Sequence, residues 1–154
     1  MNALALVPKI SAEDVLTYEH EGMIARLQEK EKLTEEKARV LFLDMLRFLL
    51  LCGTQEQILS PSEAIDQAWH HFILFTRDYR EFCQRFFGKF VDHQPFSRSE
   101  RTVKQMALEM RDRTLAVAGT VFGELSDNWL YPKTNALDCT PSTNCQEITC
   151  CAKP

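Results

Sequence analysis

Apolar side chains recur at three- and four-residue intervals along most of this chain, which places them on one face of an α-helix. This pattern predicts four main helices, over residues 11–28, 34–53, 60–88 and 99–122. The second is apolar on most sides, as expected for a central and buried helix. We therefore expect an all-α fold, a single bundle-like domain of four to five helices.

Residues with known preferences for helix ends set the expected boundaries. Ser11, Thr34 and Ser60 are in position to cap the first three helices, and Pro61 suits the first turn of the third. Glycine can end a helix in the left-handed conformation. The glycines expected to end helices are Gly53, Gly88 and Gly123.

The chain changes character after the last predicted helix. Trp129 and Tyr131 lie in a short loop, and we expect both to dock on the helices. The residues that follow are mostly polar and cannot bury enough apolar surface to offset the entropy lost on ordering. We expect a helical domain over residues 1–131 and a mobile, cysteine-rich tail over residues 132–154.

Composition narrows the class of protein. Hydrophobic residues make up 45% and charged residues 26%, a balance typical of globular proteins. The net charge of −4 provides no general attraction to phosphate backbones, so no nucleic-acid partner is expected. The most apolar run, residues 40–52, is shorter than the roughly 20 residues of a membrane span, and the first ten residues do not resemble a targeting signal. We therefore expect a cytoplasmic protein that does not enter a membrane, with mostly reduced cysteines.

Asp66 and His70 form the core of one candidate metal site. They are four residues apart and lie on nearly the same face of the predicted helix. There they can share an ion, or the carboxylate can orient the imidazole through a hydrogen bond. His71 points about 100° further round the helix and is not expected to join them.

His93 is the candidate third ligand, and its approach depends on the path of the chain. An unbroken helix from His70 to Gly88 is about 27 Å long, whereas five extended residues return at most about 17 Å. The two imidazoles meet only if the chain turns straight back, or more easily if the helix breaks near residues 76–78. The alternative interpretation is that the histidines near Trp69 are hydrogen-bonded core residues.

The same stretch resembles a known family. Asp66, Trp69 and His70 form an Asp-x-x-Trp-His pattern, and a His-x-Pro pattern follows at residues 93–95. These motifs resemble those of the bacterial members of the glycine-rich domain-containing protein family, over about residues 11–131. The resemblance implies a small helical module with a functional cluster at Asp66, His70 and His93, and it implies no established biochemical role.

The tail contains a second candidate site, because four of the six cysteines fall after residue 138: Cys139, Cys145, Cys150 and Cys151. Clustered thiols suit soft ions such as Zn(II) or Cu(I), although the spacing is not that of a C-x-x-C zinc site. Serine and threonine between the cysteines also fit a segment that is modified by thioether cross-linking. A third interpretation is a tail with incidental cysteines.

Together these features favour a metal-binding protein with a divalent ion, zinc first and copper or iron as alternatives. The expected ligands are Asp66, His70, His93, Cys139, Cys145, Cys150 and Cys151. The sequence contains no phosphate-binding glycine loop and no serine-centred nucleophile motif, so we assign no catalytic residue and favour a non-enzymatic role. The alternatives are a carrier or precursor whose tail is changed by a modifying enzyme, and a non-catalytic module that binds a protein partner.

Overall fold

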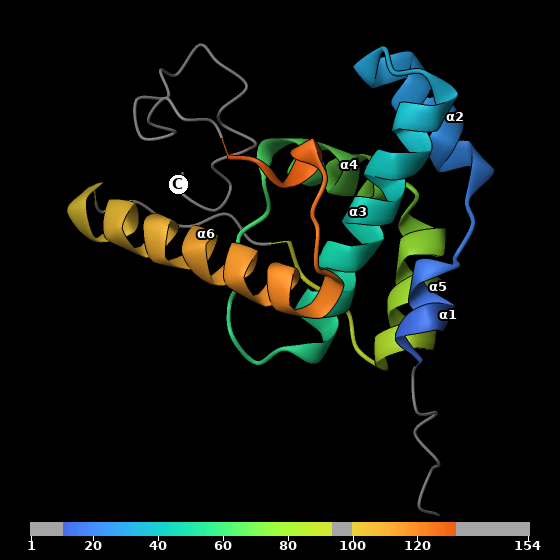
Figure 1. Ribbon diagram of the computed structural model, residues 1–154. Coiled ribbons are helices and arrows are strands. Elements are labelled where there is room, and N and C mark those ends of the chain that lie inside the picture. The colour runs from blue at the N-terminus through green and yellow to red at the C-terminus, as the bar shows by residue number, and fades with distance from the viewer. Residues whose placement is uncertain (1–10, 94–99, 132–154) are drawn as a thin grey trace, which may run out of the picture.

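The computed structural model describes residues 11–93 and 100–131, with the backbone alone for residues 100–105, and this part of the chain is entirely helical (Figure 1). Its elements are α1 (Ala12–Leu16), α2 (Glu21–Glu31), α3 (Glu35–Thr54), α4 (Glu63–Leu74), α5 (Thr76–Phe87), α6 (Glu100–Phe122) and the 3-10 helix η1 (Asp127–Trp129). The predicted all-α fold is confirmed. The described part contains six α-helices because two of the four predicted main helices are each divided.

The long helix α3 lies at the centre and contacts α1, α2, α4, α6 and η1 (Figure 1). Thr34 caps its start, as predicted, by accepting a hydrogen bond from the backbone N–H of Lys37. The predicted stop at Gly53 is wrong, because the helix continues to Thr54. A Cβ at Gly53 would lie 2.4 Å from the ring of Phe87, so this glycine permits the close approach of α5.

The first predicted helix is two helices. Ser11 caps α1 as expected, but α1 ends at Leu16 and α2 begins after His20. The Nδ1 atom of His20 accepts a hydrogen bond from the backbone N–H of Met23 at 3.0 Å, and its Nε2 atom lies 2.8 Å from the carboxylate of Asp78. Histidine is not a usual capping residue, so the sequence pattern did not indicate this break.

The third predicted helix is also two, α4 and α5, which are separated at Phe75. The predicted cap at Ser60 is wrong, because Ser62 caps α4. Ser60 is instead held in the preceding loop, where its backbone N–H donates to Thr114 Oγ1 at 2.9 Å and its carbonyl accepts from the Tyr131 hydroxyl. These contacts with α6 and the segment after it fix the path of the loop that leads into α4.

A buried carboxylate, Asp44, fixes the segment that follows α6. It accepts hydrogen bonds from Trp129 Nε1 at 2.9 Å, Ser126 Oγ at 2.6 Å and Asn128 Nδ2 at 2.9 Å. Arg47 adds an ion pair at 3.2 Å. These donors compensate the cost of burying a charge, and the prediction that Trp129 docks on the helices is confirmed.

The sequence also predicted that the chain does not enter a membrane and that it ends in a cysteine-rich tail. Over residues 11–93 and 100–131, no helix combines the length and the apolar composition needed to cross a membrane. The cytoplasmic location stays a prediction. The predicted tail, residues 132–154, lies outside the described residues, and so do Cys139, Cys145, Cys150 and Cys151.

Candidate metal centre

Asp66 lies in the first turn of α4 with its side chain fully buried. The turn places it there because Ser62 caps the helix and the neighbouring Ile65 and Trp69 face the core. A negative charge near a helix N-terminus is favoured by the helix dipole, but a buried carboxylate also needs direct partners. Two imidazoles, those of His70 and His93, lie within contact distance of it.

His70 is the first partner and comes from the next turn of the same helix. Its Nδ1 atom lies 3.3 Å from Asp66 Oδ2, and its side chain is 33% exposed. The four-residue spacing therefore brings the two side chains together as predicted. Because the carboxylate is buried and the imidazole is partly exposed, His70 forms the solvent-facing side of the pair.

The segment after α5 returns to α4 through a buried hydrogen-bond chain. α5 ends at Gly88, which adopts φ = 62°, as predicted for a glycine at this position. The hydroxyl of Tyr79 accepts from Trp69 Nε1 at 2.9 Å and donates to the carbonyl of Val91 at 2.6 Å. Burial raises the pKa of Tyr79, so its hydroxyl keeps the proton that this bond needs. The chain is thereby tied back to α4 two residues before His93.

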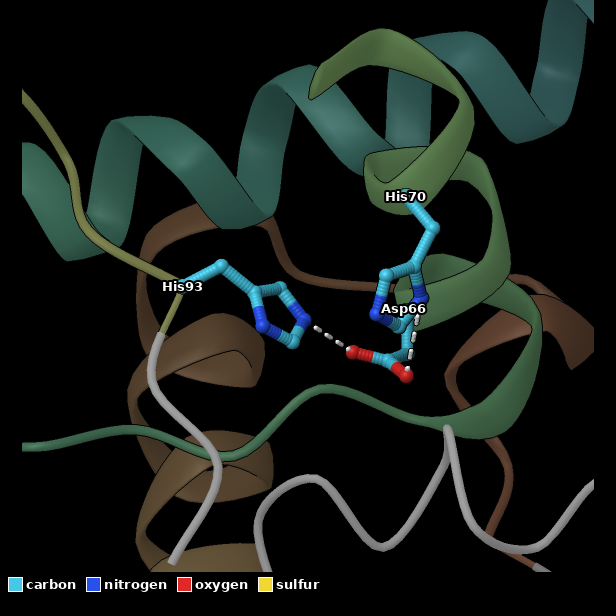
Figure 2. Close-up of side chains that lie close together, drawn as sticks. All are labelled: Asp66, His70 and His93. Atoms are coloured by element: carbon cyan, nitrogen blue, oxygen red, sulfur yellow. Dashed lines mark hydrogen bonds and ion pairs between the residues drawn. The ribbon is translucent and has the colours of Figure 1, made fainter. Parts of the chain in front are cut away.

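His93 completes the cluster from this returning segment (Figure 2). Its Nε2 atom lies 2.7 Å from Asp66 Oδ1, and its side chain is 10% exposed. Its ring centroid lies 4.4 Å from that of His70 and 4.3 Å from that of Trp69. The helix break that eases this approach is present at Phe75, one residue before the predicted position at residues 76–78.

Asp66, His70 and His93 each offer one ligand atom, and these atoms all lie within 4.8 Å of one another. In the described part of the chain, no other group of three or more such residues is arranged in this way. One carboxylate oxygen and two imidazole nitrogens are ligands that zinc, copper and iron accept. The same contacts also satisfy the buried carboxylate by hydrogen bonding, which is the core-histidine interpretation considered above.

The UCP032817-like family model matches residues 12–113, which is more than half of the chain. The chain belongs to the UCP032817-like family. This family is uncharacterised. Searches of curated proteins and of solved structures found no match. The matched region includes α1 to α5, much of α6 and all three residues of the cluster, whereas the cysteines of the tail lie beyond it.

The predicted resemblance to the glycine-rich domain-containing protein family is wrong, because the matching family model is a different one. The resemblance depended on the pattern of Asp66, Trp69 and His70, on residues 93–95, and on further positions between Ser60 and Gly88. Asp66, Trp69, His70 and His93 also take part in the local packing and hydrogen bonding just described, and a pattern of such residues does not by itself identify a family. Membership of the UCP032817-like family assigns no role to these residues.

The neighbouring His71 belongs to a separate contact between α2 and α4. Its Nδ1 atom accepts a hydrogen bond from Arg26 Nε at 3.0 Å, and its Nε2 atom donates to Glu31 at 2.6 Å. Both ring nitrogens are therefore engaged away from Asp66, as the helical geometry predicted. His71 provides a matched control for His70.

The structure describes two of the six cysteines, Cys52 and Cys83. Cys83 is buried, and burial raises the pKa of its thiol. A protonated, buried thiol is a poor nucleophile and a poor metal ligand. Cys83 therefore belongs to the core, whereas Cys52 is partly exposed and lines a pocket beside His93.

Proposed function

We propose that this protein binds a divalent metal ion, zinc first, through Asp66, His70 and His93. The observation that supports the proposal is the convergence of three ligand atoms within 4.8 Å from α4 and from a segment more than 20 residues later. Random placement of two histidines on a surface would not bring both onto one buried carboxylate. The carboxylate oxygen and the two imidazole nitrogens are atoms of the types that bind divalent ions, and they already lie close together.

The chemistry of the three residues favours zinc. Zinc binds imidazole nitrogen and carboxylate oxygen, and a site with three protein ligands keeps a fourth position for water or another molecule. Copper and iron also accept these ligands, and they remain the alternatives that metal analysis distinguishes. If the protein catalyses a reaction, the open position is where the ion would act as a Lewis acid.

The contacts among these three residues are compatible with metal binding. The Nε2 atom of His93 and the Nδ1 atom of His70 both face the carboxylate of Asp66. An ion between these atoms would replace the hydrogen bond and the ion pair by coordination bonds from the same atoms. Because bound imidazole must be neutral, protons compete with the ion and binding weakens in acid.

A second, softer site in the tail is the other part of the proposal. It rests on the clustering of thiols in the sequence, at Cys139, Cys145, Cys150 and Cys151. A full-length variant with these four cysteines changed to serine separates its contribution from that of the helical domain.

Metal analysis of the full-length protein tests the proposal. The protein is purified without chelator, its metal content is measured by elemental analysis, and zinc affinity is measured by calorimetry. In the four-cysteine variant we expect one zinc per chain, lost or weakened at least about tenfold in His70→Ala and His93→Ala. His71→Ala is the matched control and should keep wild-type affinity, with circular dichroism to verify folding. The site is refuted if His70→Ala and His93→Ala bind zinc as tightly as His71→Ala does. It is also refuted if the wild type binds no zinc.

A further inference from the structure

A pocket of about 370 Å³ lies beside the metal centre. Its lining includes His93 and Trp69, which also contact each other in the cluster. The rest comes from Cys52, from residues 55–59 and Pro61 between α3 and α4, and from residues 89–92 after α5. A molecule in this pocket therefore contacts one of the imidazoles proposed to hold the ion.

Hydrogen bonds hold both non-helical walls of this pocket in place. Thr114 Oγ1 accepts from the backbone N–H of Ser60 at 2.9 Å, and Arg113 donates to the carbonyl of Ile58 at 3.1 Å. The Tyr79 hydroxyl holds the opposite wall at Val91. The pocket is therefore formed before a ligand arrives, which reduces the ordering cost of binding.

The apolar part of the lining indicates the body of the ligand. Ile58 is 62% exposed and Phe90 is 51% exposed, although both are large apolar side chains. Side chains of this kind beside a preformed pocket, with a few polar groups, are typical of sites for small organic molecules. A compact apolar or aromatic body fits this surface.

The charges around the pocket indicate the head group. Lys89 lies among the lining residues together with Glu56 and Asp92, so the lining does not attract an anion by itself. A divalent ion bound by Asp66 and two neutral imidazoles keeps a net charge of about +1. An anionic oxygen donor is the group that neutralises it.

We propose that this pocket binds a small carboxylic acid with an apolar body, and that it does so only when the metal centre is loaded. The proposal rests on the proposed function, because the ion supplies the charge that the lining lacks. His93 is the residue that the pocket and the ion share, so binding of the acid and binding of zinc are coupled through it.

The test uses the full-length four-cysteine variant, with and without zinc, and three probes. Phenylacetate has the apolar body and the carboxylate, acetate has the carboxylate alone, and 2-phenylethanol has the body without the charge. The two tryptophans provide separate indole N–H signals in NMR spectra, since Trp69 lines the pocket and Trp129 binds Asp44. We expect phenylacetate to shift the Trp69 signal only in the zinc-loaded protein, with at least about tenfold higher affinity than either other probe.

Two exposed apolar residues provide matched variants. Ile58→Ser should weaken phenylacetate binding at least about threefold and leave zinc affinity unchanged, whereas Leu130→Ser, at a residue 66% exposed and outside this pocket, should change neither. If zinc binds but phenylacetate is no tighter than acetate, or binds equally without zinc, the pocket proposal is overturned and the proposed function stands. If the wild type binds no zinc in calorimetry, both proposals fail.

Discussion

The hydroxyl of Tyr79 is the contact on which the position of His93 depends, and Tyr79→Phe tests this directly. The substitution removes one oxygen and leaves the aromatic ring in place. Two groups lose their partner, the indole N–H of Trp69 and the carbonyl of Val91. All three residues are buried.

The expected loss in the free energy of unfolding is estimated from these two unpaired groups. A buried donor or acceptor left without a partner costs about 1–3 kcal/mol. Relief by local movement of the returning segment reduces the sum, so we expect a loss of about 3 kcal/mol in the free energy of unfolding. Zinc affinity should also fall about tenfold or more, as is usual when a residue that positions a metal ligand is changed.

Urea denaturation measures the first effect and zinc calorimetry measures the second. The control is Tyr18→Phe, because the Tyr18 hydroxyl forms no hydrogen bond with the part of the chain that the structure describes. This control should change the unfolding free energy by less than about 1 kcal/mol. If Tyr79→Phe leaves both quantities at their wild-type values, the returning segment is not held by this hydroxyl and the reasoning is refuted.

Further substitutions test the packing of the core. Gly53→Ala should lower the thermal midpoint, because the new methyl group meets an aromatic ring of α5 at 2.4 Å and overpacking costs about 1–3 kcal/mol. Gly119→Ala in α6 meets no atom within 4 Å of its Cβ and should raise stability by about 0.5–1 kcal/mol in the same melting experiment. Asp44→Ala should cost about 3 kcal/mol or more in urea denaturation, because the buried indole of Trp129 and two half-buried donors lose their acceptor. Asp112→Ala, at an exposed position, should change the unfolding free energy little. Cys83, whose thiol pKa is raised by burial, should resist iodoacetamide at pH 8 until urea unfolds the protein, as mass spectrometry of the labelled peptide can show.

Local signals in the sequence were sufficient for much of the fold. The cap at Thr34, the left-handed Gly88 and the end of α6 at Gly123 depend on one turn of chain each. The pairing of Asp66 with His70 likewise needs only the helical repeat. Such features follow from backbone geometry and do not depend on distant residues.

The helix breaks required information that periodicity does not contain. The apolar pattern continues at helical spacing across both breaks, so an uninterrupted helix is its simplest interpretation. At the first break, His20 caps α2 and binds Asp78, 58 residues later in the sequence. At the second, the chain leaves the helix at Phe75, whose side chain contacts the ring of His20. Contacts between distant residues therefore stabilise the starts of α2 and α5, where the two breaks lie.

From the sequence, His93 could be predicted to reach His70 only if the chain turned straight back or the helix broke. Its position depends on the Tyr79 hydroxyl, a polar atom on a residue that the apolar pattern assigned to the core. Tyrosine in a core usually finds a hydrogen-bond partner, but the pattern does not identify Val91 as that partner. The chain turns back because the Tyr79 hydroxyl binds the carbonyl of Val91, a tertiary contact that the local sequence pattern does not predict.

The two buried aspartates show why one cluster is a candidate site and the other is not. Asp44 accepts hydrogen bonds from an indole, an amide and a guanidinium N–H and from a serine hydroxyl, and none of the three donor nitrogens is a usual metal ligand. Asp66 is bound by two imidazoles, which can give up a proton and coordinate an ion through the same nitrogen. The first arrangement can only hold the chain together. The second can exchange hydrogen bonds for coordination bonds with little movement, and one of its imidazoles also lines a preformed pocket.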